Sequence, residues 1–111
     1  MSVKKHEVKQ HNFLAPLRGD RYFPEHLLDK GAALLMQLAE RIEQEQPQGE
    51  AVYALTHETT ELFNDLQEEF FAAESEIETA AREAIAADFQ FILTTYGYKV
   101  DLETAISPRD W

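Results

Sequence analysis

The chain contains no cysteine. This absence excludes a disulfide scaffold, a zinc site built from thiolates and thiol catalysis. The chain also lacks a long hydrophobic run, since its longest uncharged, apolar-rich segment is residues 31–39, far short of the roughly 20 residues of a membrane span. The positive charge near the first residue is followed by no apolar stretch of the kind that a secretion signal needs, so we expect a cytoplasmic protein without a membrane segment. A chain of 111 residues is long enough for one domain with a single core.

Basic residues are scarce, and they are scarcest in the middle of the chain. Residues 40–88 contain fourteen Asp or Glu but only two bases, Arg41 and Arg82, so this segment has a net charge of −12. The remaining residues contain seven acids and eight bases and are close to neutral. The net charge of −11 therefore arises in the central segment, which favours a positively charged partner. A pI near 4.6 argues against binding to nucleic acid, whose phosphates would be repelled.

The spacing of apolar residues predicts three amphipathic helices, over about 24–45, 50–72 and 76–96. Gly31 lies within the apolar face of the first helix, where we expect a neighbouring backbone or an aromatic ring to approach closely. The predicted apolar face of the second helix consists of Val52, Leu55, Thr59, Leu62, Phe63, Leu66 and Phe70.

The third helix has recognisable signals at both ends. Ser75 and Glu78 match a capping box, with the serine as N-cap. Gly97 matches a left-handed cap at the carboxyl end. Phe89 lies beside the apolar face of this helix, as Phe71 does on the second, so both could belong to a homodimer interface.

These elements predict an all-α fold. We expect an antiparallel three-helix core, with a short C-terminal helix over about 101–106 and an extended N-terminal arm packed on it. Residues 1–12 are polar and show no periodicity, so they are predicted to be a flexible tail. Residues 13–111 then form a single helical domain.

One stretch, His57-Glu58-Thr59-Thr60-Glu61, is close to the zinc-protease pattern His-Glu-x-x-His. That pattern works because two histidines four residues apart share a helix face and hold one metal ion. Here Glu61 replaces the second histidine, and an exposed His–Glu pair is the more ordinary interpretation. His57 is therefore a weak catalytic candidate, and we expect no metal and no cofactor.

Four acids of the second helix, Glu58, Glu61, Asp65 and Glu68, form a stripe opposite its apolar face. Carboxylate oxygens suit Mg²⁺ or Ca²⁺. Di-iron bundles, however, use Glu-x-x-His motifs that point inward, and the sequence contains none. We therefore interpret the stripe as a solvated surface available to a protein partner.

Asp88 is the least expected residue, because it falls at the centre of the apolar face of the third helix. A buried carboxylate must be paired or protonated. As a functional residue it would be a general base or would anchor a ligand. As a structural residue it would accept hydrogen bonds from an Arg, His, Tyr or Trp111 donor, which is the interpretation we favour.

Aromatic residues gather toward the two ends of the sequence, including Tyr22, Tyr96 and Trp111, with Arg109 beside the last of them. These four residues could line a pocket between the helices and the termini, and the basic residues of these segments, Arg109 among them, would suit a small anionic ligand. The simpler interpretation is that the termini fold back and close the core with their rings.

Several segments of the sequence resemble those of a family of small, acidic bacterial proteins catalogued as a domain of unknown function. The segments are Asn12-Phe13-Leu14-Ala15-Pro16, Tyr22-Phe23-Pro24, Tyr53-Ala54-Leu55-Thr56-His57, Phe63-Asn64-Asp65-Leu66-Gln67, Ser75-Glu76-Ile77-Glu78-Thr79-Ala80-Ala81-Arg82-Glu83 and Pro108-Arg109-Asp110-Trp111. The resemblance implies a bacterial, single-domain helical protein and supplies no activity, cofactor or catalytic residue.

Three functional hypotheses follow. The first is a binding or regulatory protein whose acidic helices engage a basic protein, as toxin-neutralising immunity proteins and nucleic-acid mimics do. The second is a small-ligand binder or enzyme with a pocket around Asp88. The third is a homodimer whose helices extend one bundle across a two-fold axis.

Overall fold

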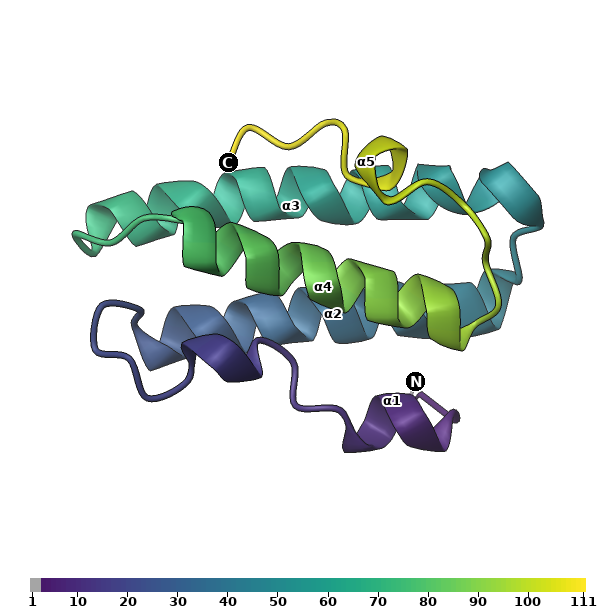
Figure 1. The fold of residues 1–111 in the computed structure, drawn as a ribbon, viewed down its shortest axis with the longest axis horizontal. Coiled ribbons are helices and arrows are strands. Elements are labelled where there is room, and N and C mark those ends of the chain that lie inside the picture. The colour runs from purple at the N-terminus through teal and green to yellow at the C-terminus, as the bar shows by residue number, and fades with distance from the viewer. Residues whose placement is uncertain (1–2) are drawn as a thin grey trace.

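The structure is a computed structural model that describes residues 3–111. Three long helices account for most of it: α2 (Glu25–Glu45), α3 (Val52–Ala72) and α4 (Thr79–Thr95). They lie side by side and alternate in direction, as their short connections require (Figure 1). The described residues form no strand, so the predicted all-α class is confirmed.

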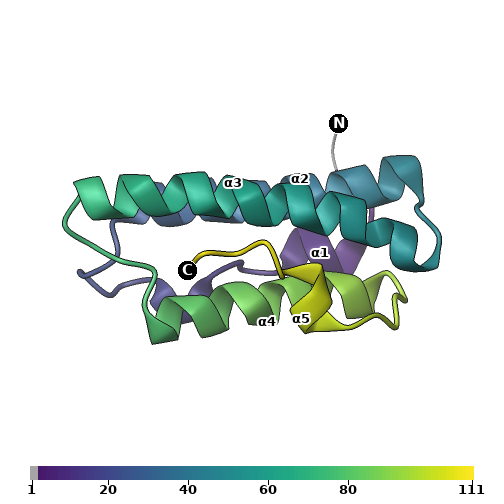
Figure 2. The same ribbon diagram turned by 90° about the horizontal axis from the view of Figure 1, so that it is seen from above.

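The shorter elements pack around this core. The α2 and α3 helices form one layer, and α4 and α1 (His6–Gln10) lie on one side of it (Figure 2). The α5 helix (Leu102–Ala105) contacts both α3 and α4. Two 3-10 turns, Ala15–Leu17 and Gly49–Ala51, lie in the connections that lead into α2 and α3. None of the described helices combines the length and the apolar composition that crossing a bilayer requires.

The apolar faces of the helices meet in a single core. Its largest fully buried side chains come from all three long helices: Leu27, Leu28, Leu35, Leu38, Phe63, Phe89, Ile92 and Leu93. Burying one such side chain contributes about 1.5–3 kcal/mol, so this core is the main source of stability.

Phe89 and Leu62 differ from their predicted positions. Phe89 is completely buried, and its ring centroid lies 6.0 Å from that of Phe63, so it cannot be a dimer contact. Leu62 was predicted to face inward, but it is 45% exposed. Its place at the edge of the apolar stripe turns it toward the outer side of the α2–α3 pair. Phe71 is 47% exposed, as its position beside the stripe predicted.

Gly31 is where the predicted close approach occurs. A β-carbon at this position would lie 2.9 Å from Leu14 Cδ1 and 3.3 Å from Phe63 Cε1. The glycine therefore allows both the N-terminal segment and α3 to pack directly against the α2 backbone. This confirms that the glycine marks a contact between elements.

The start of α4 differs from the predicted capping box. The helix begins at Thr79, and the side chain of its N-cap, Glu78, accepts no capping hydrogen bond. The Ser75 hydroxyl instead donates to the carbonyl oxygen of Tyr22 at 2.7 Å, and the serine is buried. Ser75 thus links the turn before α2 to the connection between α3 and α4, and the following residues stay non-helical.

The end of α4 follows the prediction. Gly97 has φ +82°, a left-handed conformation that favours glycine. The Tyr98 N–H donates to the Leu93 carbonyl at 2.8 Å, and the Gly97 N–H donates to the Thr94 carbonyl at 3.0 Å. This pair of hydrogen bonds is a Schellman motif.

The N-terminal segment packs on the helices. Val3 and Val8 are both buried, and Val8 belongs to α1. The sequence pattern favoured a flexible tail over residues 1–12, because these two valines stand alone among charged residues. Residues 1 and 2 lie outside the part of the chain that the structure describes.

Candidate functional site

Asp88, the buried acid of α4, accepts two hydrogen bonds from the N-terminal segment. Its Oδ2 lies 2.7 Å from the backbone nitrogen of Leu14, and its Oδ1 lies 2.8 Å from Nε2 of His11. An ionised carboxylate can only accept, so Nε2 of His11 is the donor. The His11 ring also stacks on Phe91, with centroids 3.9 Å apart, and meets the edge of Phe13 at 4.6 Å.

This arrangement makes Asp88 an attachment point for the chain. Leu14 has the left-handed backbone conformation, with φ 61°, which is unfavourable for a residue with a β-carbon. Its hydrogen bond to Asp88 and its contact with Gly31 hold it there. Asp88 is 7% exposed and lines neither of the two surface grooves described below. The side-chain donor is a histidine, one of the four donor types that the sequence left open, and the sequence did not indicate that it would be His11.

His57, the other weak catalytic candidate, attaches α5 to α3. Its Nε2 lies 2.8 Å from the carbonyl oxygen of Thr104, and its ring stacks on Tyr53 at 5.9 Å. The Tyr53 hydroxyl also accepts a hydrogen bond from the Asp101 N–H at 2.9 Å. Within residues 3–111, no three His, Asp or Glu side chains converge in a way that could hold a metal ion.

The structure does not bring the four predicted pocket residues together. Tyr22 lies before the start of α2 and Tyr96 directly after the end of α4, and these two helix ends lie at opposite ends of the molecule (Figure 1). Arg109 and Trp111 do contact each other, with the guanidinium carbon 5.9 Å from the ring centroid. Trp111 is 7% exposed and packs against Phe63 at 6.1 Å, so it closes the core.

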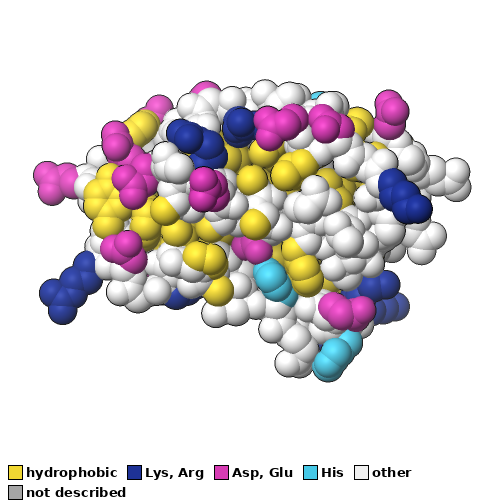
Figure 3. All heavy atoms as spheres, viewed as in Figure 1, with side chains coloured by type: hydrophobic (Ala, Val, Ile, Leu, Met, Phe, Trp, Pro, Cys, Tyr) yellow, Lys and Arg dark blue, Asp and Glu magenta, His cyan; other side chains and the backbone are white. Residues whose placement is uncertain are grey.

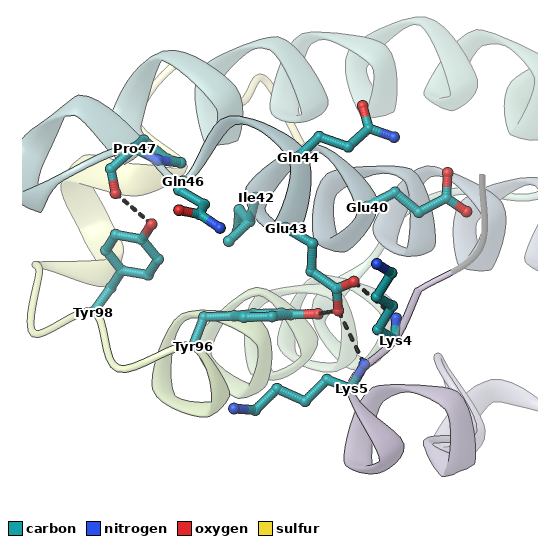
Figure 4. Close-up of a pocket in the computed structure, with 10 residues that line it drawn as sticks. All are labelled: Lys4, Lys5, Glu40, Ile42, Glu43, Gln44, Gln46, Pro47, Tyr96 and Tyr98. Atoms are coloured by element: carbon teal, nitrogen blue, oxygen red, sulfur yellow. Dashed lines mark hydrogen bonds between the residues drawn. The ribbon is translucent and has the colours of Figure 1, made fainter.

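A groove of about 720 Å³ does lie beside Tyr96, between the end of α2, the N-terminal segment and the residues that follow α4 (Figure 4). Glu43 is at its centre. The carboxylate accepts hydrogen bonds from the Tyr96 hydroxyl and from the backbone N–H groups of Lys4 and Lys5, the last two at 2.8 and 3.1 Å. We call this the Tyr96 groove. Sequence reasoning missed Glu43, because nothing local indicates that its partners are 38 to 53 residues away.

These contacts shift the pKa values of the two side chains in opposite directions. Burial raises the pKa of Glu43, but the hydrogen bonds that it accepts outweigh burial and leave the pKa below its ordinary value of 4.5. Burial, and then the hydrogen bond to Glu43, raise the pKa of Tyr96 above its ordinary value of 10.0. The pair therefore holds the groove together while Glu43 is ionised and Tyr96 is neutral.

The predicted acidic stripe lies on the surface. Glu58, Glu61, Asp65 and Glu68 are all exposed. Arg41 of α2 pairs with Glu58, but no base of residues 3–111 lies within 4.0 Å of the other three carboxylates. Further acids follow at the end of the molecule where α3 passes into α4, and Figure 3 shows Asp and Glu side chains there around a hydrophobic patch. We call the exposed acids of residues 58–83 the acidic surface.

Comparison with known proteins places the whole helical domain in one family. The model of a family described as "Family of unknown function (DUF5713)" matches residues 7–111. The chain belongs to the DUF5713 family. DUF5713 membership extends over every helix except the first residue of α1, and it assigns no activity. A search of curated proteins and a search of solved structures found no match.

Proposed function

We propose that this chain is a small, cytoplasmic bacterial protein of the binding or regulatory kind, whose acidic surface engages a basic protein partner. The observation that carries the proposal is the uncompensated charge of one end of the molecule. Residues 61–83 contain eight acids and a single base, Arg82. Among residues 3–111, a base lies within 4.0 Å of only one of these acids, Glu69, and this base is Lys30 of α2.

The spacing of the acids strengthens their combined field. Side chains three or four residues apart on a helix are about 5–6 Å from each other, which is less than the Debye length of about 8 Å at physiological salt. The electrostatic fields of Glu61, Asp65 and Glu68 therefore add together, because the carboxylates are closer to one another than the distance over which salt screens them. A cationic partner would be drawn to this surface, and an anionic one would be repelled.

The alternative hypothesis, an enzyme or small-ligand binder centred on Asp88, has less support. Both carboxylate oxygens of Asp88 already accept hydrogen bonds from the N-terminal segment. A ligand would have to displace His11 and the Leu14 N–H before it could reach the carboxylate. The Tyr96 groove is open to ligands, but its acids and lysines are mixed, so it favours neither sign of charge.

The proposal is tested by capture of partners from a bacterial lysate with two matched double variants. Glu61→Gln with Glu68→Gln neutralises two charges of the acidic surface. Glu7→Gln with Glu50→Gln removes the same charge at exposed positions elsewhere, neither of them in an ion pair of the described residues. Capture is compared at about 50 mM and about 500 mM NaCl, where the Debye length shortens roughly threefold.

We expect the wild type to retain a basic protein at the lower salt concentration and to release it at the higher one. The Glu61/Glu68 variant should retain much less of the same protein, and the Glu7/Glu50 variant should behave as the wild type does. Equal retention by both variants would place the interaction elsewhere, and a lysate that yields no basic protein at either salt concentration would contradict the proposal.

A further inference from the structure

A second groove, of about 320 Å³, runs between α2 and α3. All eight residues that line it belong to these two helices, so α4 and the termini leave this side of the pair uncovered. Its apolar residues are Ala33 and Leu34 of α2 and Leu62 and Leu66 of α3. Leu62 is 45% exposed, although a core position was predicted for it. We call this the α2–α3 groove.

Two ion pairs join the two helices on this side of the molecule. Lys30 Nζ lies 2.5 Å from Glu69, and both residues line the groove, whereas Arg41 pairs with Glu58 beyond the other end of the groove. The pairs are eleven residues apart on both helices, as antiparallel packing requires, which corresponds to about 16 Å at 1.5 Å per residue. The residues that line the groove extend over only part of this distance, from Lys30 to Gln37 on α2 and from Leu62 to Glu69 on α3, which corresponds to about two turns of a helix.

The two rims of the groove differ in charge. On the α3 side, Asp65 lines the groove, and Glu61 and Glu68 lie close by on the same helix without a base within 4.0 Å in residues 3–111. On the α2 side, the two bases Lys30 and Arg41 are already paired with α3. The net charge available to an occupant is therefore negative, and it lies directly beside exposed leucine.

A second copy of this chain would be a poor occupant. Each copy carries a net charge of −11, and apposing two such α2–α3 faces would bring the unpaired acids of both copies together. A basic occupant would gain from the same charge. An amphipathic helix is the element whose shape suits an elongated groove between two helices, since it would complete a four-helix arrangement with its apolar face inward.

We propose that the α2–α3 groove is a docking site for one amphipathic, basic helix of a partner protein. The helix would place two or three apolar side chains, spaced by three or four residues, on Leu34, Leu62 and Leu66. Its Lys or Arg side chains would face Glu61, Asp65 and Glu68. This inference rests on the proposed function, because it assigns a partner structure to the acidic surface.

The test uses two synthetic peptides of about 16 residues, a length that spans the groove with about two turns to spare. Both peptides contain only Leu and Lys, and each has as many Leu as Lys residues. The first has Leu at positions i, i+3, i+4 and i+7, so that its leucines share one helix face. The second is a scrambled order without an apolar face. Any difference between their affinities therefore comes from the pattern of leucines, since the two peptides have the same charge.

The protein is tested as the wild type and as two matched variants, Leu62→Ser and Phe71→Ser. Both residues are about half exposed on α3, but only Leu62 lines the groove. We expect the amphipathic peptide to bind the wild type at least about tenfold more tightly than the scrambled one. Leu62→Ser should weaken its binding about fivefold, as expected for loss of about half a leucine's burial. Phe71→Ser should change it less than about twofold.

The amide chemical shifts of the labelled protein locate the peptide. We expect the largest changes at Ala33, Leu34, Gln37 and Leu62. Changes confined to the Tyr96 groove, or equal effects of the two serine variants, would overturn the docking site. A concentration-dependent dimer that Leu62→Ser abolishes would also overturn it, by making a second copy the occupant.

A different variant tests whether the acidic surface itself binds the peptides. If both peptides bind equally and the double substitution Glu61→Gln with Glu68→Gln weakens the binding of both peptides, the α2–α3 groove is not the docking site and the proposed function stands. If neither peptide binds at about 50 mM NaCl, both inferences are contradicted.

Discussion

Replacing Asp88 with alanine should release the N-terminal segment from α4. The substitution removes the acceptor of the Leu14 N–H, which is buried, and the partner of His11. A hydrogen bond to a charged group contributes about 1.5–3 kcal/mol, and a buried donor left without a partner costs about 1–3 kcal/mol. These contributions overlap, because they describe the same contacts. We therefore expect Asp88→Ala to lower the free energy of unfolding by about 2–4 kcal/mol.

Asp88→Asn provides the matched control. The amide oxygen can still accept from the Leu14 N–H, and only the charge and the original contact with His11 are altered. We expect this variant to lose about 1 kcal/mol, so the two substitutions should differ by at least about 1 kcal/mol.

Urea denaturation measures the free energies of unfolding, and hydrogen exchange locates the change. The amides of residues 8–18 should lose protection in Asp88→Ala before those of α2 and α3 do. The reasoning is refuted if Asp88→Ala is as stable as the wild type within about 0.5 kcal/mol, or if alanine and asparagine have equal effects.

Three further predictions concern other contacts. Gly31→Ala should lower the free energy of unfolding by about 1 kcal/mol, because overpacking against Leu14 and Phe63 outweighs the gain in helix propensity; a more stable variant in urea denaturation would contradict the close approach. The pKa of Glu43 is lowered in the folded state, so its contribution to the free energy of unfolding is complete above pH 4.5 and is lost as the pH falls through the folded pKa. The pKa of Tyr96 is raised in the folded state, so its contribution to the free energy of unfolding is lost as the pH rises above 10.0. Glu43→Gln should therefore flatten the acid side of the stability–pH curve and Tyr96→Phe the alkaline side, and unchanged slopes would argue against the pair. Trp111→Ala should lower the free energy of unfolding by about 3 kcal/mol. Trp111→Phe should lower it by less than about 1 kcal/mol, because the buried indole N–H has no hydrogen-bond partner among residues 3–111 that the substitution could remove; equal losses for the two variants on thermal unfolding would contradict this prediction.

Helical phase accounts for what could be predicted from the sequence. The period of 3.6 residues placed Gly31 and Asp88 on buried faces, and both are buried. The same phase placed Glu61, Asp65 and Glu68 in solvent. It was less informative at the edges of a stripe, where Leu62 turned outward and Phe89 inward. Whether a residue at the edge of a stripe is buried or exposed depends on the position of the neighbouring helix. The periodic pattern of one helix carries no information about that position.

Contacts between distant segments could not be predicted from the sequence. His11 and Asp88 are 77 residues apart, and no local pattern marks the histidine as the donor. Ser75 fitted a capping box by its spacing, but its hydroxyl bonds to Tyr22, 53 residues away. The pocket predicted from Tyr22, Tyr96, Arg109 and Trp111 assumed that the two termini meet, whereas the paths of the chain take Tyr22 and Tyr96 to opposite ends.

The acidic surface is tested most directly by the association rate constant of the captured basic partner, measured by stopped flow at several salt concentrations. Electrostatic steering predicts that the wild-type rate falls by about tenfold or more between about 20 mM and about 500 mM NaCl. The fall should be clearly smaller for the Glu61/Glu68 variant and unchanged for the Glu7/Glu50 variant. A wild-type rate that does not depend on salt, or equal slopes for the two variants, would contradict the account.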